Sequence, residues 1–77
     1  MTDRLDTGPR KRSVTVAGHR TSISLEPDVW EALTALARER GVPLNTLVAE
    51  IDAARTGPLS SAVRVWVIRR LRERAGV

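Results

Sequence analysis

The sequence predicts a mostly α-helical fold with one short β-strand, which pairs with a second copy of the chain. Residues 20–25 alternate between polar and apolar side chains with a period of two, which is typical of a strand with one buried face. Glu26-Pro27-Asp28 follows at once and indicates a helix start, because proline fits the first helical position. A chain of 77 residues with short helices buries only a marginal core, which a second copy would complete.

Residues 1–12 are expected to form a flexible basic arm. The segment has almost no apolar side chains to bury, and it ends in Arg10, Lys11 and Arg12. Short basic runs occur in solvated tails as well as in arms that contact a nucleic-acid backbone. The arm is therefore expected to be either a solvated tail or a contact to a nucleic-acid backbone.

Residues 13–16 read Ser-Val-Thr-Val and also alternate like a strand. Residues 17–19 contain a glycine and are suited to a turn into the strand at 20–25. A local hairpin is therefore an alternative to pairing between two chains. We assign His19 to this turn and not to catalysis, because no partner set accompanies it.

Three helices are predicted for the remainder of the chain. The first covers Asp28 to Arg40, where apolar residues recur at helical spacing beside Trp30, and Gly41 ends it. We interpret Trp30 as a core anchor and not as a platform for stacking bases. A second helix is expected from about residue 44 to 54. A third is expected over 59–75 and opens with a Leu-Ser-Ser staple and cap. Because this segment is rich in β-branched residues, a strand is the alternative.

The net charge of +4 is unevenly distributed along the chain. Residues 1–20 carry five basic and two acidic side chains, residues 21–54 carry two and six, and residues 55–77 carry six and one. Twelve of the thirteen basic residues are arginine, whose planar guanidinium binds phosphates and guanine edges through two parallel hydrogen bonds. Basic ends of this composition indicate a polyanionic partner.

Composition argues against several classes of protein. Cysteine is absent and histidine occurs once, which excludes disulfides and a Cys/His zinc site within one chain. Neither a secretory signal nor an apolar run of membrane-spanning length is visible, so we expect a soluble cytoplasmic protein. No acid/base pair, nucleophile set or phosphate loop is recognisable, and we expect no enzyme activity, cofactor or metal.

The order strand, helix, glycine turn and helix over residues 20–55 resembles the ribbon-helix-helix family of bacterial and phage DNA-binding proteins. The likeness is carried by the run Arg-Thr-Ser-Ile-Ser-Leu-Glu-Pro at 20–27, the apolar spacing of Val29, Leu33 and Leu36, and residues 41–48. It implies an intertwined homodimer with an intermolecular two-stranded antiparallel ribbon that enters the DNA major groove. The implied divisions are a basic arm (1–12), a ribbon-helix-helix domain (13–56) and an extra C-terminal basic helix (57–77).

The resemblance also implies which residues carry function. Those placed against base edges are Arg20, Ser22 and Ser24, and arginine can donate two bonds to guanine. Those placed against phosphates are Asn45 and Thr46 at the start of the second helix, joined on grounds of charge by Arg10, Lys11 and Arg12 of the arm. Those placed in the dimer core are Thr21, Ile23, Leu25, Trp30, Leu33, Leu47 and Ile51. Pro43 departs from the serine or threonine that often opens the second helix, which weakens or shifts the expected phosphate clamp.

The leading hypothesis is a sequence-specific DNA-binding transcriptional regulator, a homodimeric repressor associated with the bacterial nucleoid. The alternative is a protein-interaction module, such as the DNA-binding antitoxin of a toxin–antitoxin pair. A long disordered tail would favour the antitoxin, and the arginine-rich C-terminus argues against it. Membrane-surface binding through residues 63–74 is weakened because arginines interrupt the apolar arc, so no membrane partner is expected.

Overall fold

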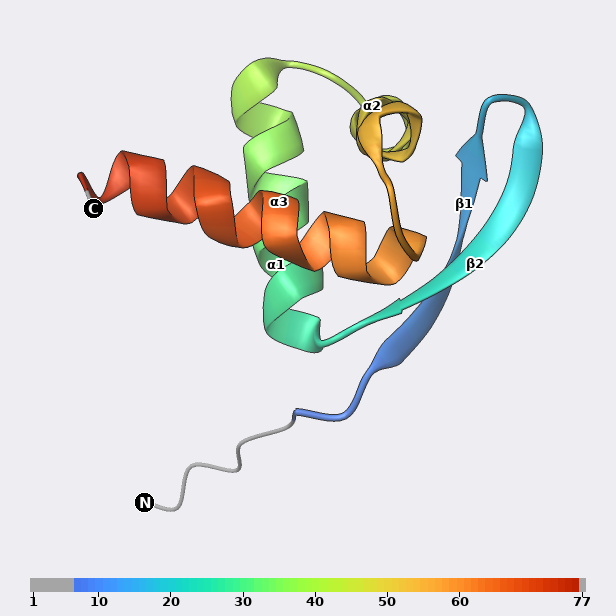
Figure 1. Ribbon diagram of the computed structural model, residues 1–77, viewed down its shortest axis with the longest axis horizontal. Helices are drawn as coiled ribbons and strands as arrows, with labels where there is room; N and C mark the ends of the chain where they lie inside the picture. Colours follow the sequence, from blue (N-terminus) through green and yellow to red (C-terminus); the bar gives the residue numbers. More distant parts are fainter. Residues whose placement is uncertain (1–6, 77) are drawn as a thin grey trace.

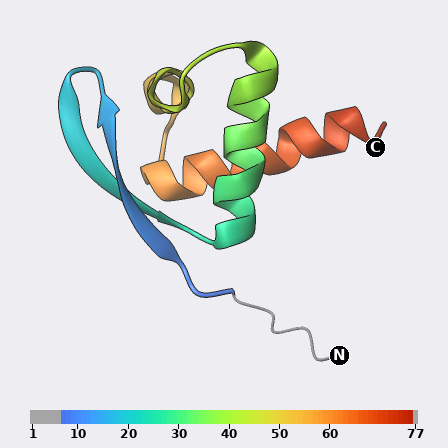
Figure 2. The ribbon, with the colours of Figure 1, turned by 180° about the vertical axis from the view of Figure 1, so that it is seen from behind.

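The computed structural model describes residues 7–76 and contains a two-stranded hairpin followed by three helices (Figure 1). The elements are β1 (Arg10–Val16), β2 (His19–Leu25), α1 (Pro27–Arg40), α2 (Leu44–Ala54) and α3 (Leu59–Arg74). All three helices lie on one side of the hairpin, and the view from behind in Figure 2 has the same arrangement. The antiparallel ribbon and the order of the helices confirm the expected fold class.

The source of the second strand differs from the expectation. Within this chain, β1 pairs antiparallel with β2, with Val14 opposite Thr21, so the local hairpin forms and the structure has two strands where one was expected. The cause is the two-residue turn Ala17-Gly18, in which both residues have positive φ angles, of 52° and 81°. Such turns match the right-handed twist of the strands they join. Within the chain, β1 therefore supplies a backbone partner for β2, and pairing with a second protomer stays a prediction.

The expected basic arm, residues 1–12, overlaps the first strand. Residues 10–12 belong to β1, because antiparallel pairing with β2 continues from Val16 back to Arg10, which lies opposite Leu25. Residues 1–6 of the expected arm lie outside the described part of the chain.

A single chain encloses the apolar core. Its buried side chains come from every element: Val14, Val16, Ile23, Leu25, Trp30, Leu33, Leu36, Ala37, Leu47, Val48, Ile51, Val63 and Val67. The residues expected between two protomers are all in this set except Thr21, which is half-buried. Two elements outside the minimal unit, β1 and α3, also contribute buried side chains to this core.

The turn between α1 and α2 is fixed by Gly41. This residue has φ 70°, its N–H donates to the carbonyl of Arg38 at 3.1 Å, and the N–H of Val42 donates to the carbonyl of Ala37 at 3.1 Å. The two bonds form a Schellman motif, which satisfies carbonyls at the end of the helix and favours glycine. The expected end of the first helix is confirmed.

The last segment is a helix, which resolves the ambiguity between helix and strand. It begins at Leu59 with Pro58 in the N-cap position and without a side-chain cap, so the expected serine cap is not formed. Val63 and Val67 are buried against the other elements, and α3 is therefore an integral part of the domain.

The turn residue Ala17 provides a test of the hairpin. Left-handed backbone costs alanine about 1 kcal/mol, whereas asparagine tolerates it and Asn-Gly is the preferred turn of this type. We expect Ala17→Asn to raise the free energy of unfolding by about 0.5–1 kcal/mol, measured by urea denaturation.

The matched control is Ala53→Asn, at an exposed position within α2. There the same replacement lowers helix propensity and should destabilise the protein by about 0.5 kcal/mol. Equal effects of the two changes would mean that the turn is not formed in solution.

Candidate nucleic-acid interface

The hairpin has one entirely polar face, which we call the outer face. Its members are Lys11, Ser13 and Thr15 of β1, and Arg20, Ser22 and Ser24 of β2. Directly opposite residues of an antiparallel pair share a face, so the three cross-strand pairs are Lys11 with Ser24, Ser13 with Ser22, and Thr15 with Arg20. All six are exposed except Ser24, which is half-buried. The face holds two cations and no carboxylate.

The opposite face anchors the hairpin to the helices. Val14 and Val16 of β1 and Ile23 and Leu25 of β2 are between 0% and 6% exposed. Because side chains of a strand alternate, burial of these four fixes the other face toward solvent. The outer face is thus held by the apolar core and not by contacts of its own.

Trp30 of α1 attaches the start of β1 to the helical layer. Its indole Nε1 donates to the carbonyl oxygen of Arg10 at 2.8 Å, which satisfies the polar atom of a side chain that is only 1% exposed. The guanidinium of Arg12 lies 5.0 Å from the centroid of the same ring, within cation–π range. Burial confirms Trp30 as a core anchor, and the position of β1 depends on it.

The outward edges of the two strands are each contacted at one point. On β1, the backbone N–H of Thr15 donates to Oδ1 of Asn45 at 3.2 Å. On β2, Arg64 of α3 donates through Nη2 to the carbonyl oxygen of Ser24 at 3.3 Å. The contacts lie at opposite ends of the ribbon, one beside the turn and one beside α1.

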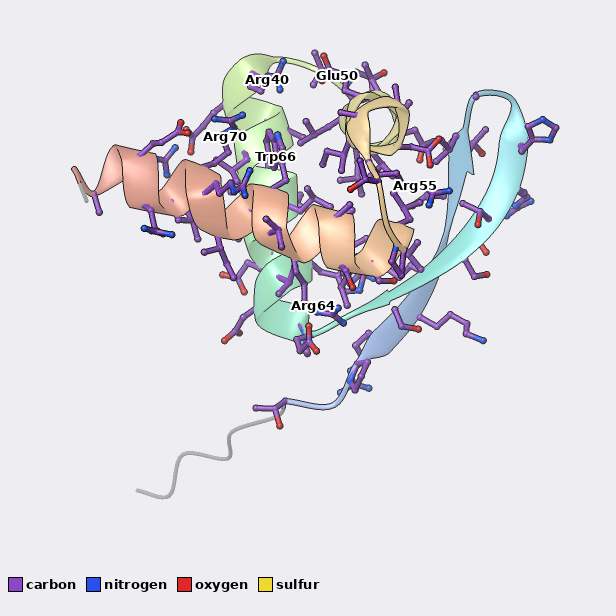
Figure 3. The ribbon with its side chains drawn as sticks, in the orientation of Figure 1. Arg40, Glu50, Arg55, Arg64, Trp66 and Arg70 are labelled. Atoms are coloured by element: carbon purple, nitrogen blue, oxygen red, sulfur yellow. The ribbon has the colours of Figure 1, made fainter. Side chains whose placement is uncertain are left out.

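Glu26 and Arg64, of which Arg64 is labelled in Figure 3, form the ion pair that fixes the end of β2. Nε of Arg64 donates to Oε1 of Glu26 at 2.7 Å, and Nη2 donates to Oε2 at 3.3 Å. Hydrogen bonds from Arg64, together with one from the backbone of Glu26 itself, lower the pKa of the Glu26 carboxyl below its ordinary value of 4.5. Both side chains are 33% exposed, so water screens the pair in part.

The cations of the outer face differ from most helical arginines in their partners. Lys11 and Arg20 have no ion pair with any residue of the range 7–76. In contrast, ion pairs join Arg40 to Glu50, Arg55 to Asp52, Arg64 to Glu26, Arg70 to Glu73 and Arg74 to Glu39. Figure 3 labels several of these, with Arg70 beside Trp66 on α3, its guanidinium 5.1 Å from the ring centroid. Charge on the outer face is therefore available to an anionic partner.

The start of α2 lies beside β1. Pro43 is the N-cap residue and provides no side-chain cap, as its chemistry implied. Asn45 and Thr46 are exposed, but Oδ1 of Asn45 already accepts the N–H of Thr15. The Nδ2 donor of Asn45 stays directed away from that bond and can still reach a phosphate.

The structure brings together some of the residues expected from sequence and separates others. Arg20, Ser22 and Ser24 share the outer face, as the alternation predicted. The run 10–12 is divided, because Lys11 lies on the outer face and its two arginine neighbours lie on the other. Ser13 and Thr15 were not among the expected site residues. The signal for both is the alternation of residues 13–16. Paired across the turn with residues 20–25, it places Ser13 and Thr15 on the same face as the expected site residues.

No group of three or more His, Asp or Glu side chains in the range 7–76 is placed to hold a metal ion. Among the helices described, none combines the length and the apolar character needed to cross a bilayer.

Comparisons with known proteins agree with this geometry. A family model described as a ribbon-helix-helix domain matches residues 9–71. A solved structure, an uncharacterized protein from Bordetella pertussis Tohama I, superposes with a TM-score of 0.79 at 21% sequence identity. The superposition covers 97% of this chain and 65% of the other, and at 21% identity the likeness concerns the fold alone. A search of curated proteins finds no match.

The Glu26–Arg64 pair predicts a pH dependence of stability. A carboxyl whose pKa is lowered in the folded state stabilises the fold above its unfolded pKa, and this contribution is lost as the pH falls through the folded value. We expect Glu26→Gln to lower the urea midpoint at pH 7, with a difference from wild type that shrinks as the pH falls below about 4.5.

The dependence should require Arg64. In an Arg64→Met background, Glu26→Gln should have little effect on the midpoint at either pH. A pH-dependent difference that persists in that background would assign the lowered pKa to another cause.

Proposed function

The chain belongs to the ribbon-helix-helix domain family, and on this premise we propose that it is a sequence-specific DNA-binding transcriptional regulator that represses as a homodimer. Proteins of this family are in general DNA-binding regulators. The observation that carries the proposal for this chain is the outer face, an exposed β surface of hydroxyls and unpaired cations without an acidic residue.

The dimensions of the hairpin suit the major groove. Neighbouring strands lie about 4.8 Å apart, and the major groove of B-DNA is about 12 Å wide and admits a two-stranded β-ribbon. The outer face would meet the base edges while the helices remain outside the groove. The hairpin and its helical support thus have the shape that groove entry requires.

The side chains of β2 suit base recognition. Arg20 can donate two hydrogen bonds to O6 and N7 of guanine, which is the commonest base-specific contact made by proteins. Ser22 and Ser24 can donate or accept at several bases and so accommodate the neighbouring positions. We assign these three residues to base contacts.

Backbone contacts would come from the start of α2 and from the base of the ribbon. The first-turn N–H groups of a helix attract phosphate, and here no side chain caps them. Nδ2 of Asn45 and the hydroxyl of Thr46 add donors at the same place. Because Asn45 also binds the backbone of Thr15, phosphates held here would set the position of the ribbon in the groove.

The antitoxin alternative gains no support from the C-terminal segment. An antitoxin of the kind considered would wrap its partner with a disordered tail. Here α3 is a packed helix, with Val63 and Val67 at 0% and 2% exposure. The buried face of α3 thus packs into the protein's own core.

The proposed function is tested by selecting from a random duplex library at increasing salt concentration. We expect one motif to be enriched at the highest salt that still permits binding, and its symmetry would report the homodimer. The affinity should fall linearly with the logarithm of the salt concentration. Uniform loss of binding with salt, with no motif enriched, would leave only a basic surface and would refute sequence-specific regulation.

Arg20→Ala tests the assignment of base contacts. Arg20 is exposed and unpaired within the described residues, so the change should leave the fold intact. We expect it to cost about 1–3 kcal/mol in binding to the selected motif and less on scrambled DNA. The matched control is Arg38→Ala, an equally exposed arginine that belongs to α1 and not to the hairpin. Equal losses on motif and scrambled DNA would reduce Arg20 to a backbone contact.

A further inference from the structure

We propose that α3 is part of the homodimer interface, and that its exposed apolar side chains pack against a second copy of this chain. These side chains are Val65, Ile68 and Leu71, which we call the α3 stripe. The inference rests on the homodimer of the proposed function. It goes beyond that function because it names a contact surface outside the strand and the two helices that carry the family resemblance.

The α3 stripe leaves apolar surface in water. Its three members are 47%, 53% and 40% exposed, and no other large apolar side chain of residues 7–76 is exposed. They recur at intervals of three residues, so they are neighbours on the helix surface. The packed side of α3 is a different one, formed by Val63 and Val67. An exposed apolar patch on a helix that already has a packed side indicates a second contact.

Arg64 shows which side of α3 the stripe occupies. Its guanidinium, labelled in Figure 3, donates to the carbonyl oxygen of Ser24 and to the carboxylate of Glu26. Ile68 and Leu71 follow Arg64 by four and seven positions, which places all three on one face of the helix. The stripe therefore lies on the side of α3 that faces the outward edge of β2.

The outward edge of β2 is open to a further strand. A two-residue turn makes the flanking residue pair hydrogen-bonded, and such pairs alternate along an antiparallel ladder. Arg20, Ser22 and Ser24 therefore direct their N–H and C=O groups away from β1. Within residues 7–76, only the carbonyl oxygen of Ser24 among these groups has a partner, Arg64 at 3.3 Å. An open edge of this kind is a template for pairing with another chain.

A cleft lies beside β2 where α3 begins. It has a volume of about 390 Å³, and its lining includes Thr21 and Ile23 of β2 together with Pro58, Leu59 and Ser60. Thr21 is half-buried here, although it belongs to the inner face of the hairpin. Inner-face side chains of a strand added at the open edge would enter this cleft. The open edge, the cleft and the α3 stripe are thus suited to one occupant.

A second copy of the chain is the occupant that fits these features together. Antiparallel pairing of two β2 strands centred on Ser22 matches the outward groups of one strand with the same groups of the other, as two-fold symmetry requires. Strand pairing alone buries little apolar surface, because the inner face of the hairpin is already covered by its own helices. A stable dimer buries about 800 Å² on each protomer. The α3 stripe provides apolar area that the strands lack.

The dissociation constant of the dimer, measured without DNA by sedimentation equilibrium, tests the α3 stripe. Ile68→Gln removes apolar surface at an exposed helical position, so the protomer should stay folded. We expect the dissociation constant to rise about tenfold or more, because the side chain is lost from both protomers. An unchanged constant, or a wild-type chain that stays monomeric, would overturn the proposal.

The matched control is Glu73→Gln. Glu73 is exposed and lies five positions beyond Ile68, which is about 140° around the helix. Its pair with Arg70 is on the surface and contributes little to stability, so the dissociation constant should stay near the wild-type value. An equal rise in both variants would also overturn the stripe as the contact.

Cysteine labelling provides a second measurement that does not depend on weakening the dimer. The chain has no cysteine, so Ile68→Cys and Glu73→Cys each introduce a single thiol. Maleimide should label Ile68→Cys more slowly as the protein concentration is raised through the dissociation constant, whereas Glu73→Cys should be labelled at a constant rate. Rates that are independent of concentration at both positions, or that fall equally at both, would refute the interface.

The proposed function fails or stands separately, because both measurements are made without DNA. If the wild type dimerises through the α3 stripe but enriches no DNA motif, the proposed regulator is refuted and the interface stands. If a motif is enriched and Ile68→Gln leaves the dimer unchanged, the interface is refuted and the regulator stands.

Discussion

The pairing of β1 with β2 across a two-residue turn is the constraint on which the rest of the structure depends. Because the side-chain period of a strand is two, this register decides which half of each strand meets the helices. A slip of one residue would place Ile23 and Leu25 in water and Arg20 in the core. The positive φ angles of Ala17 and Gly18 hold the register, and burial of the inner face reinforces it.

The alternation in residues 20–25 was sufficient to predict the strand, its faces and the exposure of Arg20 and Ser22. The proline and glycine signals predicted the start of α1 at Pro27 and the turn at Gly41, because each depends on a local backbone requirement. Strand pairing was harder to predict. Nothing in the alternation distinguishes β1 of the same chain from β2 of another, and Ala17 is not a typical residue for a tight hairpin.

The parts of the candidate site that escaped prediction are those made by tertiary contacts. The hydrogen bond from Thr15 to Asn45 joins residues thirty positions apart, and the pair of Arg64 with Glu26 joins residues thirty-eight apart. Neither contact can be predicted from the spacing of residues in the sequence. The ion pairing of the arginines is likewise a tertiary property, since Arg40, Arg64 and Arg74 meet carboxylates of other segments whereas the hairpin contains none.

The contact of Trp30 with β1 also gives the molecule an internal spectroscopic reporter. The chain contains no tyrosine or phenylalanine, so its near-ultraviolet signal arises from two indoles alone. Trp30 is 1% exposed and bound to the first residue of β1, whereas Trp66 is half-buried on α3 beneath Arg70. Detachment of the ribbon from the helices would move the first indole from an apolar to an aqueous environment and leave the second in place. The fluorescence emission of this protein is thus a direct optical measure of whether its hairpin is docked.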